Sequence, residues 1–175
     1  MKQILIVFLV LLFVFSSAAF AGSICKFLPL TNLMKQSLSA EGKTVSDMEN
    51  ELPTAEQINI PIYPGAYCGM GGESNGELSM FQFLSKDSSE KVVSWYKAKL
   101  GDNWQYAPEL AIEDMKQIAI FINTKKKNVS AMDALKYRQF AVSKVEKKDD
   151  TGFIGMSFDV SGIKSLVSMT LKPMM

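Results

Sequence analysis

Residues 78–104 read LSMFQFLSKDSSEKVVSWYKAKLGDNW, a strand pattern followed directly by a helix pattern. Side chains of a strand alternate between its two faces, so Phe81 and Phe83 share one face and Met80 lies on the other. Aromatic and aliphatic side chains in this alternation are typical of a strand in a sheet. We therefore predict a strand at 78–84.

The segment 88–100 has the signals of an amphipathic helix. Asp87 is the expected N-cap, and Glu90 three residues later completes a capping-box pattern. Gly101 is placed to end the helix in the left-handed conformation. The inward stripe consists of Val92, Val93, Tyr96 and Leu100. Such a helix, directly after a strand, is expected to cover one face of the sheet.

Further strands are expected on both sides of this unit. Alternating isoleucines predict an edge strand at 58–62 and another strand at 116–123, and a less regular apolar pattern predicts a third at 137–146. The glycines within 69–76 predict a flexible loop between strands. Short connections between the later strands favour antiparallel pairing.

The segment Val160-Ser161-Gly162-Ile163 predicts a tight hairpin turn near the C-terminus. In that register, apolar side chains of the two strands meet on one face. The predicted pairs are Val160 with Ile163, Phe158 with Ser165, Met156 with Val167, and Ile154 with Met169.

Two short helices are predicted before the first strand, one capped by Thr31 and the other by a capping-box pattern that begins at Thr44. We therefore expect a short helical segment at 22–57 and one α+β domain at 58–175. The domain is predicted as a curved, mostly antiparallel sheet of about six strands with one main helix, 88–100, on a face.

Residues 1–21 have the layout of a cleaved secretory signal. A short basic start precedes an apolar run at 4–15 and the small-residue pattern Ala19-Phe20-Ala21, which predicts cleavage between Ala21 and Gly22. The apolar run is about a dozen residues long, short of the roughly 20 that cross a bilayer. The expected product is a soluble periplasmic or secreted protein without a membrane span.

The chain contains two cysteines, Cys25 and Cys68, and both follow the predicted cleavage site. An even number of cysteines in an exported protein favours a disulfide, and the alternative is two free thiols. The bond would attach the start of the mature chain to the glycine-rich segment. A lipid anchor on Cys25 is disfavoured, because Ile24 stands where a small residue is expected.

A composite motif runs through residues 60–104. It begins with a Tyr-Pro-Gly-Ala turn at Tyr63–Ala66 and continues with a helix that contains Val-Val-Ser-Trp-Tyr-Lys at Val92–Lys97. A leucine, Leu100, and a tryptophan, Trp104, complete it. This Y-P-G-A … V-V-x-(F/W)-Y-K-x-x-L … W signature resembles a module of small exported bacterial proteins, many of them lipoproteins, which are largely uncharacterised. The resemblance implies an envelope location and an α+β fold, and it implies no activity.

Charge and composition exclude several classes of function. Beyond residue 21 the chain has 18 basic residues (19 minus Lys2) and 18 acidic residues, which gives no reason to expect nucleic acid as a partner. No histidine is present, so the commonest general base and transition-metal ligand is missing. We expect no cofactor and no metal, and we interpret most of the 11 methionines as core fillers.

We expect the contact region to be the 63–76 segment with the neighbouring sheet edge. Tyrosines suit interfaces, so the predicted binding surface comprises Tyr63, Tyr67, Gly69, Gly71 and Gly72. The favoured function is a non-enzymatic envelope module that binds another envelope protein or a small ligand. The alternatives are a carboxylate-dependent hydrolase acting on an envelope glycan and a structural or assembly factor with an exposed apolar patch.

Overall fold

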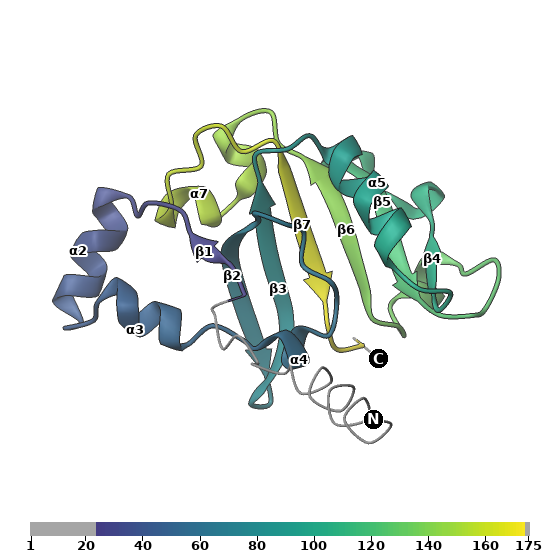
Figure 1. The fold of residues 1–175 in the computed structure, drawn as a ribbon, viewed down its shortest axis with the longest axis horizontal. Helices are drawn as coiled ribbons and strands as arrows, with labels where there is room; N and C mark the ends of the chain where they lie inside the picture. The colour runs from purple at the N-terminus through teal and green to yellow at the C-terminus, as the bar shows by residue number, and fades with distance from the viewer. Residues whose placement is uncertain (1–23, 174–175) are drawn as a thin grey trace, which may run out of the picture.

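A seven-stranded sheet organises residues 24–173, the part of the chain that the computed structural model describes (Figure 1). The strands are β1 (Lys26–Phe27), β2 (Tyr67–Ser74), β3 (Glu77–Ser85), β4 (Trp104–Tyr106), β5 (Gln117–Asn123), β6 (Gln139–Lys144) and β7 (Ser165–Thr170). Their order across the sheet is β1-β2-β3-β7-β6-β5-β4. β1 and β2 are parallel, and the other neighbours are antiparallel. The predicted signal at 1–21 and its cleavage site lie outside the described residues.

Six α-helices and three short 3-10 helices connect the strands within 24–173. They are α2 (Asn32–Ala40), α3 (Val45–Asn50), α4 (Ala55–Ile58), α5 (Ser89–Lys99), α6 (Ala131–Ala134), α7 (Ile154–Ser157), η1 (Pro108–Leu110), η2 (Glu113–Met115) and η3 (Lys148–Thr151). The α+β class and the mostly antiparallel sheet are confirmed, with seven strands in place of six. None of these helices has the length and hydropathy needed to cross a membrane.

The predicted helix at 88–100 is α5, and its cap differs from the expected one. Ser88 is the N-cap, and its hydroxyl accepts a hydrogen bond from the Lys91 backbone N–H (3.4 Å). The Asp87 carboxylate has other partners: it accepts from the Tyr63 hydroxyl (2.7 Å) and from the Lys91 ammonium group (2.9 Å). Asp87 therefore fastens the start of α5 to the segment before β2.

Helix α5 lies over one face of the sheet (Figure 1), and the main core is on this face. Phe81 and Phe83 are buried on this face, as the alternation predicted. Tyr96 of α5 is fully buried, with its ring centroid 4.6 Å from that of Phe140 and 5.9 Å from that of Phe121.

A second core cluster occupies one end of the opposite face, under α7. Ile154 and Phe158 are buried there in one cluster with Leu84 of β3 and Leu166 of β7. Because Ile154 and Phe158 are four positions apart, a single helical turn places both on the same side. This end of the sheet is thus closed by a short helix.

The hairpin predicted at 160–163 is wrong, although the turn itself exists. Gly162 has φ +76°, and the Ile163 N–H donates to the Val160 carbonyl (3.1 Å). The segment before the turn is helix α7, and β7 pairs with β3 and β6. The apolar side chains before the turn are therefore buried by helical packing.

Three smaller expectations are also wrong. No strand forms at 58–62, because α4 ends at Ile58 and the chain continues without regular structure. The glycines within 69–76 belong largely to strand β2. Gly101 does not adopt the left-handed conformation, since α5 ends at an extended Leu100.

The two N-terminal helices form as predicted and lie beyond the β1–β2 end of the sheet (Figure 1). The Thr31 hydroxyl accepts from the Met34 N–H (3.3 Å) at the start of α2. Thr44 and Asp47 form the reciprocal bonds of a capping box at the start of α3. These helices create a space between themselves and the sheet.

Candidate functional site

A cleft of about 540 Å³ lies between helices α2 and α3 and the outer strands of the sheet. Strand β2 contributes five consecutive residues, 69–73. The helical side is formed by Met34 of α2 and Met48 of α3, and it continues with Leu52 and Pro53 after α3. The backbone of one strand and the apolar stripes of two helices therefore face the same cavity.

Aromatic side chains form two further walls of the cleft, one near β1 and α7 and the other on β3, the neighbour of β2. The rings of Phe27 and Phe158 stack with centroids 5.4 Å apart, and both line the cavity. Leu78 and Phe81 of β3 also line it. A Cβ atom at Gly71 would lie 3.1 Å from the Phe81 ring and 3.5 Å from Leu78, so a side chain at this position would crowd both.

The other two glycines of β2 are required by close packing. A Cβ atom at Gly69 would lie 2.9 Å from the Gln82 carbonyl oxygen and 3.1 Å from the Ile154 side chain. One at Gly72 would lie 2.9 Å from Cγ of Met80. The register between β2 and β3 also shifts twice along this stretch, as β-bulges do. Glycine here lets a curved strand approach its neighbours.

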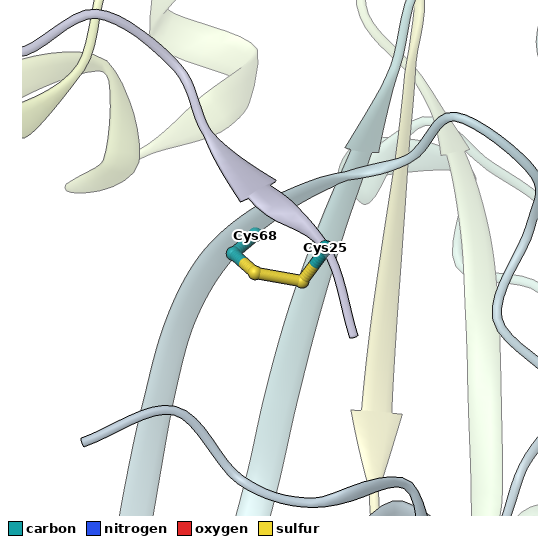
Figure 2. The surroundings of a disulfide bond; sticks show 2 residues. All are labelled: Cys25 and Cys68. Atoms are coloured by element: carbon teal, nitrogen blue, oxygen red, sulfur yellow. A yellow bond between two sulfur atoms is a disulfide. The ribbon is translucent and has the colours of Figure 1, made fainter. Parts of the chain in front are cut away.

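The predicted disulfide between Cys25 and Cys68 is confirmed, and Figure 2 shows it joining the start of β1 to β2. The two Cα atoms are 5.3 Å apart, and both side chains are buried. Cys68 directly precedes the glycine-rich wall, and Phe27 follows Cys25 by two positions. The bond therefore holds β1, and with it the Phe27 ring, against the cleft.

Thioether side chains give the cleft its chemical character. Met34 and Met48 are half-buried, and Met70 is exposed. Methionine is flexible and polarisable, so such a lining adapts to apolar groups of different shape. Among residues 24–173 no group of three or more Cys, Asp or Glu side chains is placed to bind a metal. The cleft is suited to apolar contact.

The charge at the cleft has one sign. Glu51 and Glu73 line it, and no lysine or arginine does. The Glu51 carboxylate forms an ion pair with the Lys43 ammonium group (3.6 Å), and both side chains are exposed. A ligand that carries a positive charge is therefore favoured at the rim.

The two predicted tyrosines do not line the cleft. Tyr63 is only 5% exposed: its ring lies edge-on to Trp95, and Asp87 accepts its hydroxyl hydrogen bond. Burial, together with the Asp87 carboxylate, raises the pKa of Tyr63 to about 12. Tyr67 is half-buried beneath the Lys86 ammonium group, 5.5 Å from its ring centroid. The expectation of an exposed Tyr63 is therefore wrong.

The three predicted glycines, in contrast, lie together in the cleft wall, and their role in binding stays a prediction. The methionines opposite them were missed. Met34 and Met48 belong to narrow apolar stripes on the two short N-terminal helices, and we interpreted most methionines as core fillers. The narrowness of those stripes is the signal that could have revealed a partly open contact.

A second hollow of about 360 Å³ adjoins the cleft and shares Met70 and Gly71 with it. Met80 and Phe153 line this hollow, and Phe153 is 75% exposed. Exposed apolar side chains that gather around connected hollows are typical of interaction surfaces. The apolar character of the cleft thus extends across β2.

Comparison of the chain with protein-family models, with curated proteins and with solved structures finds no match. The geometry of the cleft is therefore the basis for a functional interpretation.

Proposed function

We propose that this protein is an exported, non-enzymatic binding module of the cell envelope, which holds an apolar group of a protein or small ligand in the cleft along β2. The observation that carries the proposal is the open, methionine-lined cleft of about 540 Å³. Ligand sites typically measure about 300–1,000 Å³ and are mostly apolar with a few polar groups. The cleft has this size and this lining.

Two features support export. The pattern at 1–21 is that of a secretory signal, and the disulfide is a bond that persists in oxidising compartments. The module at 60–104 that resembles exported bacterial proteins agrees with an envelope location. We expect the N-terminal sequence of the envelope-fraction protein to begin at Gly22, and an uncleaved chain confined to the cytoplasm would contradict this.

The hydrolase alternative is less well supported. A glycosidase needs one carboxyl group kept protonated by apolar burial. Both carboxylates at the cleft, Glu51 and Glu73, are exposed. An assembly factor remains the second candidate, because the exposed Phe153 and Met80 extend the apolar surface beyond the cleft.

Binding of the neutral fluorescent probe N-phenyl-1-naphthylamine tests the cleft. We expect saturable binding with a rise in fluorescence, because the probe exchanges water for apolar side chains. Met48→Glu places a charge inside the cleft and is expected to weaken binding on the order of tenfold or more. Met115→Glu is the matched control, since Met115 is 61% exposed on η2 and lies outside the cleft lining.

Circular dichroism of both variants establishes that they are folded. Equal affinities of the two variants would place the probe elsewhere on the molecule. In that case, or if the wild-type protein bound no probe, the proposed function would fail.

A further inference from the structure

The outer edge of β2 has no strand partner over most of its length within the described residues. β1 pairs with β2 only opposite Tyr67 and Cys68. After Phe27 the chain leaves β2, and Leu30 forms an isolated β-bridge with Phe158. Residues 71–74 pair with β3 on one side, Gly69 and Met70 form a bulge in that pairing, and 69–73 line the cleft. An unpaired strand edge presents N–H and C=O groups that template another strand.

We propose, on the basis of the proposed function, that the cleft binds an extended segment of another polypeptide, which adds to the sheet as a strand along residues 69–74. In this recognition mode, main-chain hydrogen bonds supply affinity and alternate side chains enter pockets. At about 3.3 Å per residue, an edge of this length forms a contact about 20 Å long. The added strand would extend β2 where β1 leaves it.

The glycines make this edge accessible. Gly71 is exposed and Gly72 half-buried, and neither carries a side chain that would shield the backbone, whereas Gly69 is buried. Opposite them, the flexible side chains of Met34 and Met48 line the same cavity and are suited to receive apolar side chains of the added strand. Backbone recognition and side-chain recognition are thereby combined in one cleft.

Charge complementarity defines the partner further. Glu51 and Glu73 line the cleft without a basic residue among its lining, so a lysine or arginine on the incoming segment is favoured and an acidic residue is disfavoured. The expected ligand is a segment with apolar side chains at alternate positions and a basic residue beside Glu73. A fully acidic segment is excluded on the same grounds.

A peptide library with the full chain tests strand addition. The peptides have about eight residues, with Val or Leu alternating with Thr and one terminal Lys. The tightest member is resynthesised in two forms, each N-methylated at one alternate set of amides. In an added strand only one set of amides faces β2. We therefore expect one form to lose on the order of tenfold or more in affinity and the other to bind nearly as the parent does.

Charge variants provide an independent readout. Glu73→Lys is expected to weaken binding of the Lys-bearing peptide by roughly three- to tenfold at low salt, with a smaller effect at high salt. Glu109→Lys, at an exposed position of η1 outside the cleft lining, is the matched control and is expected to leave binding unchanged.

Several results would overturn strand addition. One is equal affinity of both N-methylated forms with the parent, and another is failure of every library member to bind. If the protein forms a dimer that the peptide dissociates, the occupant of the cleft is a second copy of this chain. If N-phenyl-1-naphthylamine still binds in the cleft in any of these cases, the proposed function stands and only the strand inference fails.

Discussion

Replacing both cysteines by alanine tests how much stability comes from the bond between β1 and β2. Cys25 and Cys68 are 43 positions apart in the chain. For a closed loop of that length, the loss of chain entropy in the unfolded state amounts to about 4 kcal/mol. The double variant is expected to lose about 4 kcal/mol of unfolding free energy.

Urea unfolding followed by tryptophan fluorescence measures the change, since Trp95 and Trp104 are both half-buried and pack against the main core. With a slope of roughly 2 kcal/mol/M, the midpoint should fall by about 2 M. The wild-type protein under reducing conditions should unfold at nearly the same midpoint as the double variant, because it has lost the same constraint.

Two outcomes would refute this reasoning. A loss smaller than roughly 1 kcal/mol would show that the unfolded chain is not constrained by the bond. Reaction of both cysteines with a thiol reagent in the unreduced, denatured protein would show that the bond does not form. The double variant should also bind N-phenyl-1-naphthylamine more weakly, because Phe27 has lost its anchor in the cleft wall.

Gly69→Ala should destabilise the protein by about 1–3 kcal/mol in urea unfolding, because its Cβ would lie 2.9 Å from a backbone oxygen. The control Gly101→Ala, with nothing within 4 Å of the new Cβ, should be neutral or stabilising. Equal effects of the two substitutions would contradict the close packing at Gly69. The pKa of Tyr63 is raised to about 12, so Tyr63→Phe should remove one tyrosine that ionises above pH 10 from the alkaline absorbance titration. The contribution of Tyr63 to the unfolding free energy is present below pH 10 and falls as the pH rises through 12. Hydrogen bonds from Lys116 and a second lysine lower the pKa of Glu146 from 4.5 to about 2, so its contribution is present above pH 4.5 and lost as the pH falls toward 2. Urea midpoints should depend less on pH over this range in Glu146→Gln, and identical pH profiles would refute the pairing.

Local signals allowed much of the fold to be predicted. Strands at 78–84 and 116–123 were identified because period-two alternation is a property of the strand itself. The caps at Thr31 and Thr44 were identified because capping depends on residues within one turn of each other. The main helix was placed for the same reason, with an error of one residue at its cap.

Features that depend on distant partners could not be predicted in this way. Ile154 and Phe158 fit both an alternating strand and one turn of helix, and the choice is made by packing against Leu84 of β3. One partner of β7 is β3, which occurs far earlier in the sequence. The other is β6, which is separated from β7 by an intervening segment. No local pattern carries this information.

The cleft was predicted only in part for a similar reason. Glycine has low strand propensity, so Gly69, Gly71 and Gly72 favoured a loop. In the structure, close approach of neighbouring side chains makes glycine necessary within β2. The cleft lining comes from several separated segments, and only their tertiary arrangement shows that Met34 and Met48 face these glycines.

The position of β7 has a consequence for how the chain folds during its biosynthesis. Within residues 24–173 β7 is the last strand along the chain, yet it lies between β3 and β6 in the middle of the sheet (Figure 1). Without it, the ladder β1-β2-β3 and the ladder β6-β5-β4 share no hydrogen-bonded strand. A ribosome-bound chain therefore lacks the strand that joins the halves until 165–170 have been made. Until then the two ladders cannot join into one sheet.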